Sequence, residues 1–348
     1  MTWRDTGKDK GMVKNGKVAY IFPGQGSQAV GMGKNLYEKY QSARDVFHEA
    51  DRTLDFSLSR LCFEGPEEEL TQTINVQPAI LTTSIACLRA AEEIMGGQIP
   101  LPDMVAGHSL GEYTALVVAG VLSLAEAVSL IRERGRLMHQ AGEANPGGML
   151  AVLGLDPAAV ENICMDADTE ISNVNCPGQI VVSGAEDKLA EFKRLAETKG
   201  ARRIIRLKVS GAFHSRLMQP AADGLMRAIT DTAFSEPEVP VMANVTTAIL
   251  NSADDIRQEL VDQVTHCVRW QGSVEDMING GVTRFVEIGH GRVLADLIKR
   301  INPEVPVLNI DDVDTEKQAA LWWTEHRRQH IRGLVEKAIQ SAKSSQVG

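Results

Sequence analysis

Three features are missing from this 348-residue sequence, and each absence excludes a class of protein. No stretch approaches the roughly 20 apolar residues that a membrane-spanning helix needs. The first 17 residues are polar and contain no apolar segment typical of a secretion signal. The formal net charge is -10, whereas general nucleic-acid binding needs a basic surface. We therefore expect a soluble protein of the cytoplasm that neither enters a membrane nor binds nucleic acid.

The five cysteines are widely spaced. They include no Cys-x-x-Cys pair and no cluster with histidines of the kind that holds zinc, so no metal site is expected. They are interpreted as small buried side chains in a reducing compartment. With 348 residues, of which 43% are hydrophobic, the chain can bury a sizeable core.

Short apolar runs separated by helix-length segments indicate the fold class. The runs cover residues 18–22, 103–106, 239–242, 284–288 and 305–310; the helical segments include 78–95, 112–119, 124–140, 217–230 and 292–301. This alternation is typical of an α/β protein with a parallel sheet covered on both faces. We predict such a body from residues 17–141 and 211–312, followed by a charged helical tail over residues 313–348.

The middle of the chain has a different order of elements. Between residues 142 and 210 the pattern predicts strands at 149–153, 170–174, 180–183 and 203–209, with helices from Pro157 and over 186–198. The order βαββαβ is that of a ferredoxin-like unit. We predict that residues 142–210 form a small subdomain inserted in the body, with a cleft between the two where a small molecule binds.

One serine lies in the context of a nucleophile elbow. Residues 107–111 are Gly-His-Ser-Leu-Gly, placed after a predicted strand and before a predicted helix. The glycines allow a tight turn that exposes the Ser109 hydroxyl, and the helix N-terminus favours developing negative charge. The sequence therefore predicts Ser109 as a nucleophile; an ordinary strand-to-helix turn is the alternative.

A serine nucleophile needs a base to take its proton. Among the eight histidines, His214 directly follows the last strand of the inserted unit, at the predicted cleft. We therefore favour His214 as the base, although a structural histidine is the alternative reading of its position.

One arginine lies on the apolar face of its predicted helix. Within residues 124–140, Arg134 is three or four positions away from four apolar residues, namely Leu130, Ile131, Leu137 and Met138. Burying an unpaired guanidinium is costly, so Arg134 should meet a carboxylate. That group is either an internal Asp or Glu, or a substrate carboxylate held bidentately.

Five motifs occur in an order that resembles a known family. They are Phe-Pro-Gly-Gln-Gly-Ser-Gln at 22–28, Gly-His-Ser-Leu-Gly-Glu-Tyr at 107–113, Arg-Gly at 134–135, Asn-x-Pro-Gly-Gln at 175–179 and Gly-Ala-Phe-His-Ser at 211–215. Over residues 17–311 the chain resembles the malonyl-CoA:acyl carrier protein transacylases and the acyltransferase domains of polyketide synthases. The resemblance implies an α/β-hydrolase-like body with a ferredoxin-like insertion.

The resemblance also implies an activity. Malonyl would pass from malonyl-CoA to the phosphopantetheine thiol of acyl carrier protein through a malonyl-serine ester, for fatty acid synthesis. No cofactor is expected, since malonyl-CoA is a substrate, and a monomer suits an enzyme that admits two bulky partners in turn.

Individual residues take roles that the resemblance implies. Ser109 is the nucleophile, His214 the general base and Arg134 the clamp on the malonyl carboxylate. The main-chain carbonyl of Gln263 orients the histidine in place of an aspartate. The oxyanion hole is formed by the backbone N–H groups of two residues, Gln25 and Leu110.

Two further positions concern selectivity and a departure from the family. Phe213 resembles the malonyl-selecting form, because an aromatic ring beside the acyl α-carbon leaves little room for a methyl branch; such discrimination is worth about 1–3 kcal/mol. The family usually has Gly-Pro-Gly after the late strand, whereas residues 289–291 are Gly-His-Gly. His290 either lies near the cleft or is a surface histidine, and we favour the surface position.

Other functions share part of this pattern. An esterase or thioesterase would use Ser109 and His214 with water as the acceptor, but a hydrolase of neutral esters has no use for a buried Arg134. A trans-acting acyltransferase of a polyketide synthase would share every motif. A non-catalytic scaffold that binds carrier protein would tolerate loss of the serine or histidine, and both are present.

A basic segment interrupts the acidic sequence. Residues 193–208 contain seven Lys or Arg and one acidic residue, Glu197. Because it ends six residues before His214, the segment is predicted to steer an acidic carrier protein and coenzyme A phosphates to the cleft. The alternative is a solvated helix face and a charged edge strand.

Overall fold

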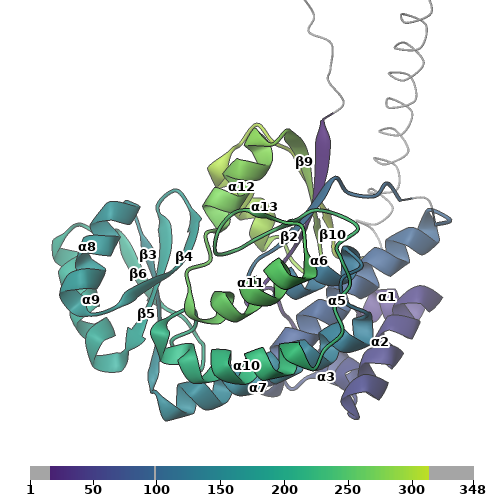
Figure 1. Cartoon of the computed structure of the whole chain (residues 1–348), viewed down its shortest axis with the longest axis horizontal. Helices are drawn as coiled ribbons and strands as arrows, with labels where there is room; N and C mark the ends of the chain where they lie inside the picture. Colours follow the sequence, from purple (N-terminus) through teal and green to yellow (C-terminus); the bar gives the residue numbers. More distant parts are fainter. Residues whose placement is uncertain (1–15, 98, 313–348) are drawn as a thin grey trace, which may run out of the picture.

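The computed structural model describes residues 16–97 and 99–312, so the predicted tail over 313–348 lies outside the described residues. Its main sheet has the strand order β10-β9-β1-β2-β7-β8. The strands are β1 (Lys17–Phe22), β2 (Met104–Gly107), β7 (Val241–Met242), β8 (Ile249–Leu250), β9 (Val282–Ile288) and β10 (Val307–Ile310). Helices alternate with these strands, which confirms the α/β class (Figure 1).

The prediction of a wholly parallel sheet is wrong at one edge. Strands β10, β9, β1, β2 and β7 pair in parallel, but β8 pairs antiparallel with β7. A short turn connects β7 and β8, with the Ala243 N–H donating to the Ala248 carbonyl at 2.9 Å. A turn this short permits only an antiparallel pair, since a parallel one needs a long crossover.

Alternate residues of the central strands enter two separate cores. Tyr20 and Phe22 of β1 pack in one apolar cluster, and Ala19 and Ile21 in the other. Side chains of a strand alternate between its faces, so both faces of the sheet are covered, as predicted. The second cluster is completed by α12 (Trp270–Asn279) and α13 (Val293–Ile301).

The remaining helices of the body include three that position the site: α5 (Thr73–Ile94), α6 (Gly111–Val118) and α7 (Leu124–Ala144). The others are α1 (Lys34–Lys39), α2 (Gln41–Leu54), α3 (Leu58–Glu64), α4 (Glu67–Leu70), α10 (Gln219–Thr230) and α11 (Ala253–Thr265). Helix α5 begins five residues before its predicted start and contains Pro78. Its first turns are buried between other helices, and this burial outweighs the hydrogen bond that the proline cannot donate.

A second sheet belongs to the middle of the chain and lies at the left of Figure 1. Its order is β4-β5-β3-β6, with antiparallel pairs throughout. The strands are β3 (Gly147–Leu153), β4 (Glu170–Cys176), β5 (Gln179–Ala185) and β6 (Arg203–Arg206). Helices α8 (Pro157–Ala167) and α9 (Glu186–Thr198) pack with it around a separate apolar core. Strand β6 ends three residues before its predicted end, and these three residues, Leu207, Lys208 and Val209, line a cavity.

The chain enters and leaves this unit at adjacent points. A Cβ atom on Gly142 would lie 2.3 Å from the carbonyl oxygen of Ser210, so the two crossings nearly touch. The unit also meets the body where the Val268 N–H donates to the Ser172 carbonyl at 2.9 Å. These contacts hold β4 beside the end of α11.

Candidate active site

Ser109 lies in a tight turn between β2 and α6. Its φ of 53° is in the left-handed region. A Cβ on Gly107 would lie 1.9 Å from the backbone of Gly111, and one on Gly111 would lie 2.2 Å from the Phe22 carbonyl oxygen. The glycines are therefore required by close backbone approach, as the motif predicts.

His214 lies within hydrogen-bond distance of the serine. Its Nε2 is 2.8 Å from Ser109 Oγ, and its Nδ1 is 2.6 Å from the main-chain oxygen of Gln263. A carbonyl oxygen only accepts, so Nδ1 carries the proton and Nε2 faces the hydroxyl as an acceptor. Burial, and then the Arg134 cation, lower the pKa of His214 from 6.5 to about 3, so its ring is neutral at neutral pH.

Arg134 is buried beside the same hydroxyl. Its guanidinium donates to Gln77 Oε1 at 2.6 Å, to Gln263 Oε1 at 2.9 Å and to Ser109 Oγ at 3.1 Å. Among the residues that the structure describes, no Asp or Glu oxygen lies within ion-pair distance of it. The nearest carboxylate contact is indirect: Gln263 Nε2 donates to Glu112. The predicted direct partner inside the protein is thus not found.

Two backbone amides of residues that line the Ser109 cavity have no acceptor among the described residues. The N–H groups of Gln25 and Leu110, the predicted oxyanion pair, have no hydrogen-bond partner among the described residues. Both residues line the cavity that contains Ser109. The site therefore offers free donors next to the nucleophile.

The cavity has a volume of about 300 Å³ and lies between the body and the second sheet. Phe213, Met138, Met149 and Val181 form its apolar wall. The cavity thus brings together the predicted residues Ser109, His214, Arg134, Gln25, Leu110 and Phe213, and Gln263 lies directly behind them.

Several residues of this site were missed by the sequence reasoning. His108 and Asn175 lie within the quoted motifs and bond to each other, Nε2 to Oδ1 at 2.9 Å; burial lowers the pKa of His108. Gln77 and Asn244 come from distant segments. Gln77 precedes the predicted start of its helix at residue 78, and Asn244 follows a predicted strand, so neither residue carried a signal.

His290 lies away from Ser109. It borders a separate cavity of about 160 Å³, with Gly31, Gly33 and Asp311 among the other lining residues. His290 therefore does not line the catalytic cavity, in agreement with the surface position that the sequence favours. The glycine that precedes it has a φ of 132°, so the loop turns there without needing proline.

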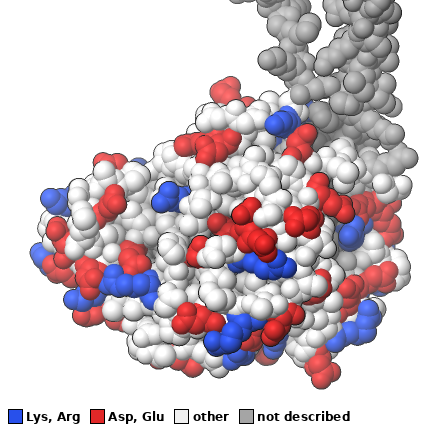
Figure 2. Space-filling model, viewed as in Figure 1, with Lys and Arg blue, Asp and Glu red and all other residues white. Residues whose placement is uncertain are grey.

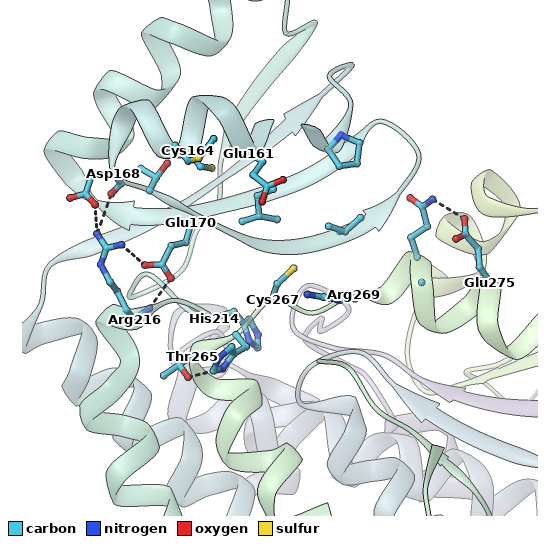
Figure 3. Close-up of a pocket in the computed structure, with 18 residues that line it drawn as sticks. Glu161, Cys164, Asp168, Glu170, His214, Arg216, Thr265, Cys267, Arg269 and Glu275 are labelled. Carbon is cyan, nitrogen blue, oxygen red and sulfur yellow. Dashed lines mark hydrogen bonds and ion pairs between the residues drawn. The ribbon is translucent and has the colours of Figure 1, made fainter. Parts of the chain in front are cut away.

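A larger cavity of about 790 Å³ is also lined by His214. Figure 3 shows it between the unit of α8 and β4 and the residues that follow α11. Arg216 at its edge pairs with Asp168 at 2.6 Å and with Glu170 at 2.8 Å. His214 thus lines two cavities.

Some features are absent from the described part of the chain. Within residues 16–97 and 99–312, no group of three or more His, Cys, Asp or Glu side chains could hold a metal ion. None of the helices in these ranges combines the length and the apolar character needed to cross a membrane. All five cysteines are free; four are buried and Cys267 is half-buried, which departs from the prediction for that residue.

Comparison with known proteins identifies the family. The chain is 45% identical over 304 residues to the malonyl CoA-acyl carrier protein transacylase of Bacillus subtilis, which covers 86% of this chain and 95% of that protein. The structure of an acyl carrier protein S-malonyltransferase from Vibrio cholerae is similar, with a TM-score of 0.83, 39% identity and coverage of 87% of this chain and 99% of the other. A malonyl-transacylase in complex with its type II PKS acyl-carrier protein matches with a TM-score of 0.84, 37% identity and coverage of 87% and 99%. Residues 19–341 match the model of the acyl transferase domain, and the chain belongs to that family.

Proposed function

We propose that this protein transfers malonyl from malonyl-CoA to the phosphopantetheine thiol of an acyl carrier protein through an ester on Ser109. The observation that carries the proposal is the position of the Ser109 hydroxyl, 2.8 Å from His214 Nε2 and 3.1 Å from Arg134 Nη2. A base and a cation that could bind a carboxylate thus meet at one nucleophile.

The reaction proceeds in two half-reactions. Ser109 Oγ attacks the thioester carbonyl while His214 Nε2 takes the hydroxyl proton. The oxyanion receives hydrogen bonds from the Gln25 and Leu110 amides, each worth roughly 3–4 kcal/mol at this stage. The intermediate then expels the coenzyme A thiolate, which takes the proton from His214. In the second half-reaction His214 deprotonates the carrier thiol, which attacks the ester carbonyl; the intermediate then expels Ser109 Oγ, which takes the proton back from His214.

Gln263 supports this sequence through its main chain. Its carbonyl oxygen accepts the Nδ1 proton of His214, which fixes the tautomer and stabilises the imidazolium that forms during each half-reaction. No carboxylate is needed at this position.

Arg134 selects the acyl group. A charged fork with only amide and hydroxyl partners is satisfied best by a carboxylate, which accepts two parallel hydrogen bonds. The free malonyl carboxylate would be held there while the thioester carbonyl lies at Ser109. Phe213, in the wall of the cavity, would disfavour an α-methyl branch.

We also propose a division of the chain into subdomains, an oligomeric state and a carrier-protein partner. The order β4-β5-β3-β6 supports a ferredoxin-like small subdomain over residues 142–210, inserted in an α/β-hydrolase-like body of residues 17–141 and 211–312. A monomer in the cytoplasm, acting in fatty acid synthesis without a cofactor, fits a cleft that must admit two large partners. A polyketide carrier protein is the alternative partner, because one matching structure is such a complex.

Intact-mass measurement after mixing with malonyl-CoA tests the proposal. One malonyl adduct should form on the wild-type protein and disappear when acyl carrier protein is added. Ser109→Ala should show no adduct. Labelling that persists in Ser109→Ala, or an adduct that water removes as fast as the carrier thiol does, would contradict a Ser109-linked transferase.

A further inference from the structure

The nucleophile is held in a conformation that its residue type disfavours. Ser109 has a φ of 53°, and such a backbone costs on the order of 1–3 kcal/mol for a residue other than glycine. It persists only where surrounding contacts fix it. Gly107 and Gly111 avoid steric clashes in the turn, but they provide no contact that stabilises the backbone conformation of Ser109.

The side chain of Asn244 bridges the elbow. Its Oδ1 accepts the Ser109 N–H at 2.7 Å, and its Nδ2 donates to the Gly107 carbonyl at 2.7 Å. Asn244 follows β7, the parallel neighbour of β2, so its loop reaches the same sheet edge as the elbow. A primary amide offers a donor and an acceptor at once, and both are used across the two peptide groups of the turn.

Asn244 is itself fixed on both sides. Its N–H donates to Glu112 Oε1 at 3.2 Å, and its carbonyl accepts the Arg269 N–H at 2.8 Å. Glu112 is fully buried and also accepts from Gln263 Nε2. Asn244 is only 1% exposed, so water does not compete for these contacts.

The two successive amides of the turn differ in their partners. Asn244 accepts the Ser109 N–H, whereas the next amide, that of Leu110, has no hydrogen-bond partner among the described residues, and Leu110 lines the cavity. We propose that Asn244 is a positioning residue for acyl transfer: its amide clamps Gly107 to Ser109 and so sets the direction of both the Ser109 hydroxyl and the Leu110 N–H. This inference rests on the proposed function, in which that hydroxyl attacks and that N–H binds the oxyanion.

The test is rapid-quench intact-mass measurement of malonyl-CoA acylation in Asn244→Ala. The amplitude counts the competent sites, and the rate constant reports how well each site is aligned. We expect the rate constant at saturating malonyl-CoA to fall on the order of 10²-fold, as misplacement of a reacting group by about 1 Å does, with little change in KM because Arg134 is untouched. A merely structural role would lower the amplitude and leave the rate constant unchanged.

Asn309→Ala is the matched control. Asn309 likewise contacts a buried carboxylate, because its Nδ2 donates to Glu287 at 2.8 Å, but it lies on β10 away from the elbow. This variant should lose stability in thermal unfolding and keep the wild-type rate constant.

Asn244→Asp keeps the proposal testable if the alanine variant does not fold. An ionised carboxylate accepts the Ser109 N–H but has no proton for the Gly107 carbonyl, and two buried carboxylates, those of Glu112 and Glu259, lie at the main-chain N–H of residue 244. A protonated carboxyl restores the donor, so the acylation rate constant relative to wild type should rise as the pH falls. A ratio independent of pH, or an acylation rate constant in Asn244→Ala equal to that of Asn309→Ala, overturns the inference. Failure of the wild-type protein to form any adduct would instead overturn the proposed function.

Discussion

Arg134 carries a buried charge with no direct counter-ion among the described residues. Its partners are two glutamine oxygens and the nucleophile, and Glu112 is reached only through Gln263. An uncompensated buried charge is costly, and a ligand carboxylate would offset that cost. The residue therefore bears on both substrate choice and the state of His214.

Arg134→Ala should lose malonyl transfer far more than acetyl transfer, because an acetyl group has no carboxylate to lose. Removing one partner of a hydrogen-bonded buried charge pair costs about 2–5 kcal/mol, so the malonyl rate should fall at least 30-fold more than the acetyl rate. Parallel kcat/KM measurements with malonyl-CoA and acetyl-CoA check this. Equal losses for both acyl groups would make Arg134 a structural residue.

The pH dependence of acylation should also shift in that variant. Burial and then the Arg134 cation lower the pKa of His214, so the wild-type rate should fall on acidification only well below pH 6.5. Without the cation the pKa of His214 rises, and the loss of rate should begin at a higher pH. Adduct formation with acetyl-CoA between about pH 4 and pH 8 would show the shift, since this substrate has no carboxylate of its own.

Arg136→Ala is the control for both experiments. Arg136 lies on the same helix, half-exposed, and pairs with Glu133 at 2.5 Å. Its removal should change neither the preference for malonyl over acetyl nor the pH at which the acylation rate begins to fall on acidification. An acid limb that is identical in wild type and Arg134→Ala would show that burial alone sets the pKa of His214.

At the scale of elements, the elbow depends on backbone contacts between β1, β2 and α6. It could be predicted from sequence because it is local: five consecutive residues between a strand and a helix determine it. Its supports could not, because Asn244 and Gln263 lie more than 130 residues away from Ser109 along the chain. The start of α5 was misplaced for a related reason: Pro78 is a local stop signal, and tertiary burial overrides it.

Gly111→Ala tests the close approach of these elements. The added Cβ would lie 2.2 Å from the Phe22 carbonyl oxygen and 2.8 Å from that of Pro23, so β1 and α6 must move apart. We expect a loss of about 1–3 kcal/mol in the free energy of unfolding and slower Ser109 acylation. Denaturant titration and adduct formation measure the two effects.

Gly272→Ala is the matched control, for which we expect no loss in the free energy of unfolding. Gly272 lies in α12, and the nearest contact of an added Cβ is the Thr247 methyl group at 3.1 Å, a side chain that can shift. Alanine is more favourable than glycine inside a helix, so the free energy of unfolding of this variant should be unchanged or higher by about 0.5–1 kcal/mol. If Gly111→Ala behaves like Gly272→Ala, the elbow tolerates more space than the contacts indicate.

At the scale of the whole molecule, a protein of net charge -10 must attract an acidic carrier protein. Figure 2 shows acidic side chains spread across the larger body, with basic side chains gathered at several points that include the unit of α8 and α9. Three basic residues of the predicted segment 193–208 are already in ion pairs within the protein. Arg194 pairs with Glu191 at 2.7 Å, Lys193 with Glu197 at 4.0 Å and Arg206 with Glu186. Among the described residues, four exposed cations of the segment have no ion pair: Lys199, Arg202, Arg203 and Lys208. These four form the β6 basic patch, and Lys208 also lines the catalytic cavity.

Charge reversal at Arg202 and Arg203 should raise the KM for acyl carrier protein and weaken its dependence on salt. Long-range attraction between opposite charges speeds association and is screened over about 10 Å at 0.1 M ionic strength, so the effect should be largest at low salt. Acylation of Ser109 by malonyl-CoA should change less, because the chemistry lies inside the cleft. The matched control is charge reversal at Lys39 and Arg52, exposed residues of α1 and α2 at the opposite end of Figure 1, which alters the net charge equally. If both double variants raise the KM alike, the change in net charge is responsible. If neither variant raises the KM at low salt, the β6 basic patch is only a solvated face and the carrier protein docks elsewhere. The next positions for charge reversal would then be Arg292, Lys299 and Arg300.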